Sequence, residues 1–440
     1  MFARSAASSS RRRPLIETAQ LVERIWQRDP SVWTGKDEAQ WLGWLDEPPR
    51  MRERVHELMG FAAGVDVDDV VLLGMGGSSL APEVMRRLFG AERFHVLDTT
   101  HPTAIRRLEA SIDIGRTLFF AASKSGTTLE TRSHTDYFRE LGGRFAVITD
   151  PGSPLAELSK DVFYGEPTIG GRYSALSVFG ILPAIFMGID ADLLLDRAEE
   201  MREACRLEEG NPGLELGLQL ARTTFLQVEG DFGLWVEQLL AESTGKEGKG
   251  IVPVRSGGET IEFRLPDPYE LGQEFFRWEF GTAVAGSLLG INPFDQPNVQ
   301  AAKDQTNEVL LSRGQGSGPG TRPEGSLDEL LSEATPDHYV AVLGFIDPAR
   351  EAELEPLARR AEETGAAVAV GLGPRYLHST GQLHKGGPDN GLFVQVVDDL
   401  GEELAIPGRP YGFRTLIAAQ AAGDFQALQE RGRRIVRIHL

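Results

Sequence analysis

Residues 120–143 of this 440-residue chain read FAASKSGTTLETRSHTDYFRELGG, and this stretch decides the fold. An apolar strand ends at Ala122, and a helix is predicted from Leu129 to Leu141, where two glycines stop it. The turn at 123–128 carries four hydroxyl side chains, a lysine and a glycine. The unpaired amides and the dipole of a helix N-terminus attract anions, so the turn predicts a phosphate site. The alternative is an ordinary N-cap rich in serine and threonine.

The same alternation of strand and helix extends on both sides of this stretch, which predicts parallel, doubly wound sheets. We expect an α/β protein with a tail and helical lead-in at 1–60, a first domain at 61–200 and a second at 212–440. In the first domain we predict strands near 67–73, 94–99, 116–122, 144–150 and 161–165. In the second we predict short strands at 233–237 (GLWVE) and 251–254 (IVPV), strands at 339–345, 366–372 and 391–397, a closing strand, and helices at 212–230, 272–290 and 412–430.

The composition excludes several classes of protein. A net charge of −20, from 45 basic and 65 acidic residues, argues against nucleic acid or an anionic membrane as a partner. The single cysteine, Cys205, allows neither an intrachain disulfide nor a cysteine metal site. The chain has no apolar run of about 18 residues, and its basic, serine-rich start lacks the apolar core of a secretory signal. We therefore expect a disordered N-terminal tail and a cytoplasmic location.

A glycine-rich turn, GMGGSS at 74–79, follows the first predicted strand. Glycines let the backbone approach a ligand, and Ser78 adds a hydrogen-bond donor. A dinucleotide-binding fold is one interpretation, because Asp98 ends the next strand where a ribose-binding acid would lie. Ser79 occupies the position of the third glycine of that fingerprint, which counts against it. A tight turn without any ligand is the remaining alternative.

Two motifs place charged side chains where they can act on a substrate. In GGRYSALS (170–177), two glycines precede Arg172, whose guanidinium can stabilise an oxyanion. In EQLLAESTGKEGKG (237–250), Gln238 and Glu242 are four residues apart and share a helical face. A carboxylate beside apolar residues has a raised pKa and can act as a base. The alternatives are a surface arginine in a turn and a solvated glutamate.

Two more motifs complete the set. FDQPNVQAAK (294–303) places Gln296 and Lys303 two helical turns apart, and HSTGQLHKGGPDNG (378–391) contains His384 before a Gly-Gly-Pro turn. The motifs together supply a phosphate cradle, a guanidinium, a base, an ammonium and an imidazole. His, Asp and Glu residues show no convincing metal-ligand spacing. The combination predicts proton transfer on a sugar phosphate without a metal or another cofactor.

The motifs GMGGSSLAPE, SKSGTTLET, GGRYSALS, EQLLAESTGK and FDQPNVQAAK resemble the glucose-6-phosphate isomerase family, in that family's order over residues 74–303. The C-terminal part, with STGQLHKGGP and RRIVRIHL, is most similar to the isomerase half of transaldolase–isomerase fusion proteins. The resemblance implies two sugar isomerase (SIS) domains. It also implies reversible aldose–ketose isomerisation of glucose 6-phosphate and fructose 6-phosphate through an enediolate. The residues before the first SIS domain are too few for a transaldolase barrel.

The resemblance also implies a role for each motif. By this resemblance, the phosphate is held by Ser123, Ser125, Thr127 and Thr128, with support from the backbone of Lys124. The sugar is lined by Gly77 and Ser78 and positioned by Gln238 and Gln296. Arg172 stabilises the enediolate, Glu242 moves the proton between C2 and C1, and Lys303 and His384 assist ring opening. One feature departs from the family pattern, because GQLHKGGP follows Lys303 instead of preceding it. We therefore expect a rearranged strand to bring His384 to the same space.

Other functions fit some of these residues. A non-catalytic SIS regulator would keep the phosphate loop but would not need Arg172, Glu242 and Lys303 together. A dual phosphoglucose and phosphomannose isomerase differs only in the shape of the pocket around C2. A nicotinamide dehydrogenase is disfavoured by Ser79. The expected partners are a small sugar phosphate, a second copy of the chain in a homodimer, and a transaldolase through a functional link.

Overall fold

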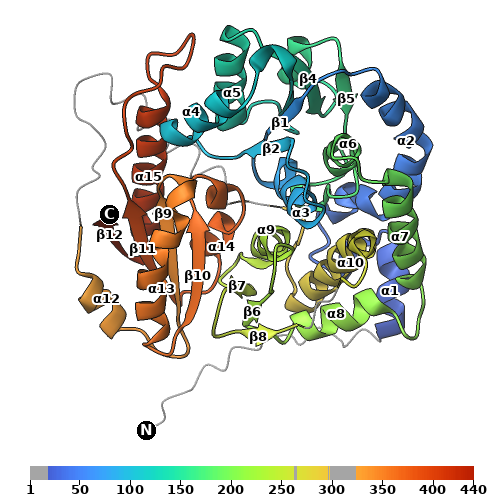
Figure 1. The fold of residues 1–440 in the computed structure, drawn as a ribbon. Coiled ribbons are helices and arrows are strands. Elements are labelled where there is room, and N and C mark those ends of the chain that lie inside the picture. Colours follow the sequence, from blue (N-terminus) through green and yellow to red (C-terminus); the bar gives the residue numbers. More distant parts are fainter. Residues whose placement is uncertain (1–17, 262–264, 296, 298–323) are drawn as a thin grey trace.

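The computed structural model describes residues 18–261, 265–295, 297 and 324–440. The first half forms a parallel sheet in the order β2-β1-β3-β4-β5 (Figure 1). Its central strands are buried along their whole length, because helices cover both faces of a parallel sheet. The strands are β1 (Asp69–Leu73), β2 (Phe94–Leu97), β3 (Thr117–Ala122), β4 (Arg144–Thr149) and β5 (Val162–Tyr164).

The two faces of this sheet have separate cores. One face packs against α2, α3 and α6, and the other packs against α4 and α5. Phe413 and Leu416 of the C-terminal helix α15 join the second core, so the end of the chain is built into the first half. These helices are α2 (Glu47–Ala63), α3 (Leu80–Leu88), α4 (Pro102–Ser111), α5 (Leu129–Glu140), α6 (Val178–Phe186) and α15 (Phe413–Glu430).

The second half contains two smaller parallel sheets, in the orders β10-β9-β11-β12 and β7-β6-β8. An antiparallel bridge between Ser256 and Val368 joins them. The strands are β6 (Phe225–Gln227), β7 (Val252–Val254), β8 (Glu259–Thr260), β9 (Tyr339–Phe345), β10 (Ala367–Leu372), β11 (Gly391–Val397) and β12 (Arg434–His439), and the helices are α8 (Pro212–Leu220), α9 (Gly233–Thr244), α10 (Leu271–Leu289), α12 (Leu327–Ser332), α13 (Glu355–Glu362) and α14 (Gly381–Gly386).

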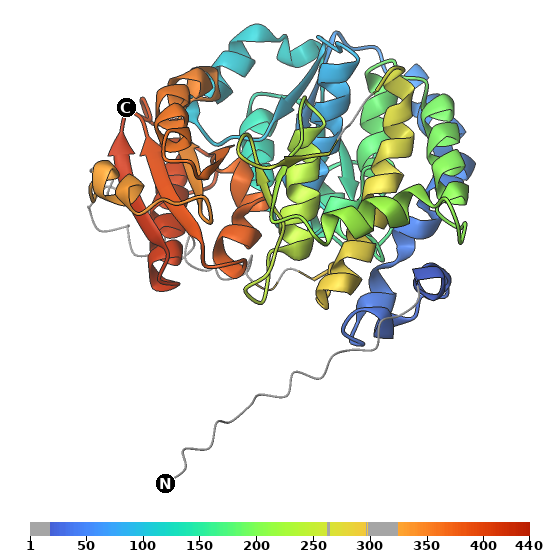
Figure 2. The same ribbon diagram turned by 90° about the horizontal axis from the view of Figure 1, so that it is seen from below.

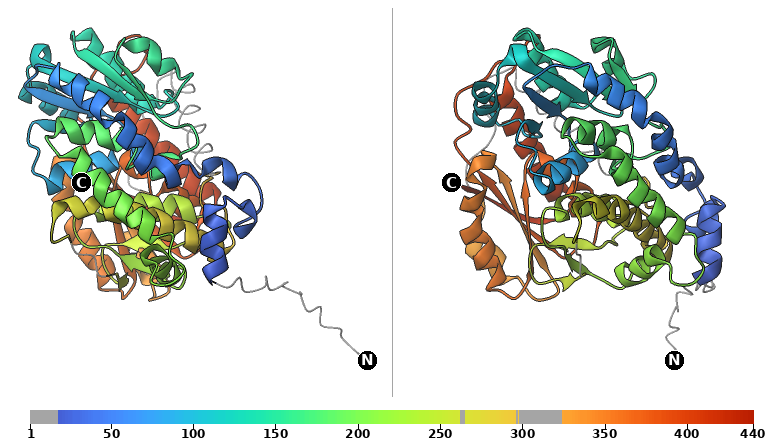
Figure 3. Two further views of the ribbon diagram at one scale, coloured as in Figure 1. Left: turned by 90° about the vertical axis from the view of Figure 1, so that its right-hand side faces the viewer. Right: turned by 45° about the vertical axis from the view of Figure 1, so that its right-hand side comes forward.

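Residues 212–289 lie between the N-terminal helices and the C-terminal strands, as the view from below shows (Figure 2). The helical lead-in, α1 (Thr18–Trp26), lies on the opposite side of the molecule from β9–β12 (Figures 1 and 3). It is fixed by the Trp26 indole N–H, which donates to the carbonyl of Cys205 after α7 (Ala191–Ala204), at 2.9 Å. In the described residues no helix combines the length and the apolar character needed to cross a membrane.

The predicted α/β fold with parallel sheets is confirmed. The orders β2-β1-β3-β4 and β10-β9-β11-β12 are equivalent, because in both the first strand of the four lies between the second and the third. The domain boundaries stay a prediction. Two local predictions were wrong. Residues 233–237 begin helix α9 rather than form a strand, and the predicted helix at 212–230 ends at Leu220 and is followed by β6. Short apolar runs do not separate strand from helix, and Trp235 here packs edge-on against Phe275 of α10.

Candidate functional site

Glu242 lies in the last turn of α9, one turn after Gln238, and both side chains are buried. Burial raises the pKa of the Glu242 carboxyl, while the Arg172 guanidinium, a hydrogen bond from Gln238 and the charge of His378 partly oppose this shift. The amide oxygen of Gln238 is buried and has no hydrogen-bond partner in the part of the chain that the structure describes. The face of α9 therefore presents a buried base and a free hydrogen-bond acceptor.

Arg172 lies in the 3-10 turn Gly171–Tyr173 and is only 2% exposed. Its Nη1 contacts Glu242 Oε2 at 3.3 Å, and its Nε donates to Ser243 Oγ at 2.9 Å. Its Nη2 donates to the carbonyl oxygens of Pro293 and Asp295 at 2.8 and 2.7 Å. These bonds hold a permanent positive charge in one orientation beside the carboxylate.

The glycine-rich turn packs directly on these elements. A Cβ on Gly77 would lie 2.0 Å from the carbonyl oxygen of Gly171, and one on Gly76 would lie 2.5 Å from that of His378. Gly76 also has φ +54°, so only glycine fits without strain. Ser78 is buried at the end of the turn. Gly77 and Ser78 thus lie at the meeting point of the Arg172 turn, helix α9 and the turn at 375–378.

The structure argues against a dinucleotide-binding site, because Asp98, the acidic residue expected to bind a ribose, is already paired. Asp98 follows β2 and accepts a hydrogen bond from Arg375 Nε at 2.8 Å, and it is buried against that guanidinium. A carboxylate already engaged in a buried ion pair is a poor ligand for a ribose hydroxyl, because breaking such a pair is costly.

The loop at 123–128 has the features of a phosphate cradle. Ser123 Oγ and Thr128 Oγ1 lie 2.9 Å apart, as do Ser125 Oγ and Thr127 Oγ1. Thr128 caps helix α5 without a side-chain hydrogen bond, so the first-turn amides stay available to a ligand. Lys124 instead directs its ammonium to Asp150, at 2.8 Å, which leaves only its backbone on the loop side.

The two histidines of the motif HSTGQLHKGG differ in their contacts: His384 packs against an aromatic ring, and His378 contacts a carboxylate. His384 lies in α14 rather than in the expected strand, and its ring is buried against Tyr339, at 3.2 Å from the hydroxyl. Burial, with the nearby charges of Lys385 and Arg433, lowers the pKa of His384 to about 3. This imidazole stays neutral and packs as part of a core.

His378 is the histidine that the structure brings to the site, and the sequence reasoning missed it. Its Nε2 lies 2.9 Å from Glu130 Oε1, in the first turn of α5 after the loop at 123–128. Its carbonyl accepts a hydrogen bond from Gln238 Nε2 at 2.9 Å. The signal was present in the sequence, because His378 begins the motif of which only the second histidine was chosen.

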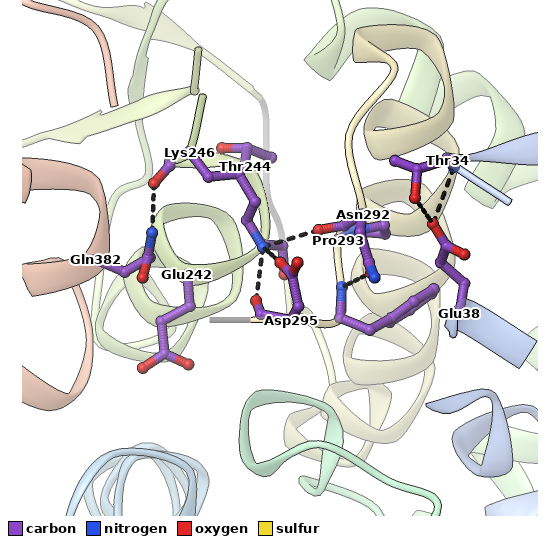
Figure 4. A network of polar contacts seen from close by, with 12 residues as sticks. Thr34, Glu38, Glu242, Thr244, Lys246, Asn292, Pro293, Asp295 and Gln382 are labelled. Atoms are coloured by element: carbon purple, nitrogen blue, oxygen red, sulfur yellow. Dashed lines mark hydrogen bonds and ion pairs between the residues drawn. The ribbon is translucent and has the colours of Figure 1, made fainter. Parts of the chain in front are cut away.

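A buried lysine, Lys246, holds the loop that leads towards FDQPNVQAAK (Figure 4). Its ammonium donates to the carbonyl of Asn292 at 2.8 Å and to the carbonyl and carboxylate of Asp295, both at 2.6 Å. Burial and the nearby Arg172 lower its pKa to about 8, and Asp295 and Glu242 oppose this shift. Gln296 and Lys303, predicted to act here, lie outside the described residues.

The described residues contain no group of three or more His, Cys, Asp or Glu side chains arranged to hold a metal ion. The structure does bring together the buried carboxylate of Glu242, the fixed guanidinium of Arg172 and the imidazole of His378. Glu130 contacts this imidazole and follows the hydroxyl-rich loop at 123–128, so that loop lies next to the same group. This fold and site define an α/β protein with parallel sheets and a buried site that combines a carboxylate, a guanidinium and an imidazole.

Comparison with known proteins shows what the chain is similar to. The family model described as phosphoglucose isomerase matches residues 50–218 of this chain. The chain is 34% identical over 265 residues to a glucose-6-phosphate isomerase of Thermus thermophilus, covering 54% of this chain and 61% of that relative. It is 29% identical to one of Thermosynechococcus vestitus, with 76% and 70% covered.

The fold is also found in a solved structure. A glucose-6-phosphate isomerase from Chlamydia trachomatis superimposes with a TM-score of 0.50 at 19% identity, and the match covers 71% of this chain and 81% of that one. The chain spans about three fifths of the length of the Thermus thermophilus relative. The resemblance drawn from the motifs is thus confirmed, while the closer likeness to transaldolase fusion proteins stays a prediction.

Proposed function

We propose that this chain is a glucose-6-phosphate isomerase, which interconverts glucose 6-phosphate and fructose 6-phosphate through an enediolate. The observation that carries the proposal is the buried contact of 3.3 Å between Glu242 and Arg172. It puts a carboxylate whose pKa is raised by burial next to a fixed positive charge. Relatives of this name in several organisms support the same activity.

In the proposed reaction Glu242 removes the proton from C2 of the open-chain aldose and delivers the same proton to C1, while the hydroxyl proton of O2 passes to O1. The electron pair of the broken C–H bond moves into the enediolate, so negative charge passes from the carboxylate to the substrate oxygens. Arg172 therefore faces one negative charge before and after the transfer. Because its guanidinium is already held by Ser243 and two carbonyls, little reorganisation is needed as the charge moves.

The substrate is held at both ends. The hydroxyls of residues 123–128 and the first amides of α5 bind the phosphate with neutral donors, which leaves Arg172 for the reacting end. Gly77 and Ser78 line the sugar, and the unpaired oxygen of Gln238 accepts a bond from a sugar hydroxyl. Gln296 and Lys303 keep their proposed roles in positioning and ring opening.

We assign ring opening to His378 in place of His384. Burial opposes ionisation of Glu130, but the charge of His378 and their hydrogen bond lower its pKa to about 2, so the carboxylate stays charged. Gln420 Nε2 also donates to Glu130 Oε1, at 2.6 Å. The carboxylate therefore orients the imidazole, which acts as the proton donor to the ring oxygen.

Replacing each histidine separately tests this assignment. His378→Ala is expected to slow isomerisation of fructose 6-phosphate about 10²-fold, because general acid catalysis of ring opening is lost. Its effect on solvent deuterium exchange at C2 of erythrose 4-phosphate should stay within about threefold, since that sugar cannot close a five- or six-membered ring. His384→Ala should change both rates by the same factor. A larger effect of His384→Ala on fructose 6-phosphate alone would restore the original assignment.

Lys246 provides a prediction on pH. Lys246→Met is expected to lower kcat about tenfold, because Asp295 loses the ammonium that fixes its carbonyl for Arg172. In the unchanged chain kcat should fall above pH 8, as an ammonium with a pKa of about 8 deprotonates and releases Asp295. The variant should lack this alkaline limb. Equal kcat and an unchanged limb between pH 7 and 9.5 would show that Lys246 has no positioning role.

The activity itself is tested by turnover of fructose 6-phosphate, coupled to glucose-6-phosphate dehydrogenase in the presence of a chelator. Turnover that survives the chelator supports a metal-free isomerase. Sugar-phosphate binding by calorimetry without turnover would instead indicate a regulator. Mannose 6-phosphate in the same assay decides whether the pocket accepts both configurations at C2.

The cellular setting belongs to the same proposal. We place the enzyme in the cytoplasm, as a homodimer with a functional link to a transaldolase. The likeness of STGQLHKGGP to the fusion proteins supports that link. Light scattering of the purified chain tests the dimer, and a monomer with full turnover would contradict it.

A further inference from the structure

A cavity of about 520 Å³ lies behind two walls of the proposed active site. Helix α9 contributes Glu237, the neighbour of Gln238, and the turn at 375–380 contributes Arg375 and Thr380, on either side of His378. Residues 370–372 at the carboxyl end of β10 line it as well. Ligands of parallel α/β sheets bind at the carboxyl ends of strands, and this volume suits a molecule of hexose size.

The positive charges of the cavity are already neutralised. Arg375 donates to Asp98 at 2.8 Å, and Arg255 donates to Glu355 at 2.6 Å. Two negative charges of the cavity are not neutralised in this way, because Glu237 and the nearby Glu351 have no salt bridge in the described part of the chain. The cavity therefore has two carboxylates available to a ligand.

A hydroxyl adds a second and independent observation. Thr380 is only 7% exposed and lines the cavity, yet its Oγ1 has no hydrogen-bond partner among the residues that the structure describes. Ser379, also buried, lies beside it in the cavity wall. A polar ligand in the cavity can therefore bond to the Thr380 hydroxyl without displacing a protein partner.

The titration of Glu237 supports a ligand at this place. Burial raises the pKa of its carboxyl to about 7, Arg375 opposes the shift and Glu351 adds to it. Carboxyls that titrate near neutral pH in a cavity are concentrated at functional sites. A cation bound beside Glu237 would stabilise the charged form.

We propose that this cavity is a second ligand site, distinct from the sugar-phosphate site, which binds a small cationic and hydroxylated molecule of hexose size. Its ammonium would lie between Glu237 and Glu351, and its hydroxyls would bond to Thr380 and Ser379. Anionic sugar phosphates are excluded, because both arginines are engaged and the free charges are negative. The ligand would touch the backs of the walls that carry Gln238 and His378.

Calorimetry on the full chain with N-methylglucamine tests the site, since this hydroxylated amine stays protonated between pH 6 and 8. We expect one saturable site at pH 8 and about fivefold weaker binding at pH 6, where Glu237 is protonated. Sorbitol, a neutral polyol of the same length, should bind at least about tenfold more weakly. Glu237→Gln should weaken amine binding about tenfold at pH 8 and remove the pH dependence, and Thr380→Val should weaken it about threefold.

Two controls separate this site from general charge and from the proposed active site. Glu57→Gln removes one exposed carboxylate from α2 and should leave amine binding unchanged. Glu242→Gln should also leave it unchanged, whether or not the chain isomerises sugar phosphates. The proposal is overturned by the absence of saturable heat, by equal binding of sorbitol, by wild-type affinity of Glu237→Gln, or by competition from inorganic phosphate.

Discussion

Glu242→Gln is expected to reduce kcat for fructose 6-phosphate about 10³-fold, with KM changed by less than about threefold. The amide keeps the shape of the side chain and its place beside Arg172, but it cannot accept the C2 proton. Binding should survive, since we propose that the loop at 123–128 holds the phosphate and that Gln238 positions the sugar. Steady-state kinetics gives both constants, and calorimetry with fructose 6-phosphate checks binding directly.

Glu247→Gln is the matched control, because Glu247 follows Glu242 by five residues and is exposed. It should keep kcat and KM within about twofold of the unchanged chain. Near-normal turnover in Glu242→Gln would remove the carboxylate from the chemistry and require another base. Loss of binding together with turnover would instead assign Glu242 to substrate positioning.

Arg172→Met is expected to lower kcat about 10³-fold, the scale seen when a charged transition state loses a fixed donor. It should also lower the free energy of unfolding by about 3 kcal/mol, because Glu242 is left as a buried carboxylate without its partner. The loss of stability should shrink at low pH, where a carboxyl of raised pKa is protonated in the folded chain. Urea unfolding at pH 5 and pH 8, with steady-state kinetics, measures both effects.

Arg172→Lys separates charge from geometry. A lysine keeps the positive charge but cannot make the bonds to Ser243, Glu242, Pro293 and Asp295 at once. Stability should largely return, while kcat should stay about 10²-fold below that of the unchanged chain. Full recovery of kcat in Arg172→Lys would mean that charge alone suffices and that the fixed orientation has no catalytic value.

Much of the first half could be predicted from local sequence. Its first four strands are apolar runs of four to six residues, and the motifs at 74–79 and 123–128 each lie between a strand end and a helix start, where the pattern predicted them. The secondary structure of the second half was harder to predict from sequence, because β6, β7 and β8 have two or three residues each. Runs this short carry no periodicity, so GLWVE looked like a strand although packing against α10 makes it helical.

The two histidines show the same limit within the site. Both lie in one short motif, and nothing local distinguishes them. Their difference is made by contacts more than 40 residues away: Tyr339 encloses His384, and Glu130, 248 residues from His378, holds that ring near Glu242.

The sequence by itself determined the local features of this protein: a hydroxyl-rich loop at a helix start, glycines for close backbone approach, and a glutamate and a glutamine on one helical face. These depend on residue type and on spacing within a few residues. Only the tertiary structure decided which groups meet, which histidine is buried, that Lys246 and Arg172 hold one loop, and that a cavity lies behind α9. Burial and charge pairing set pKa values and orientation, and both come from segments that lie far apart in the chain.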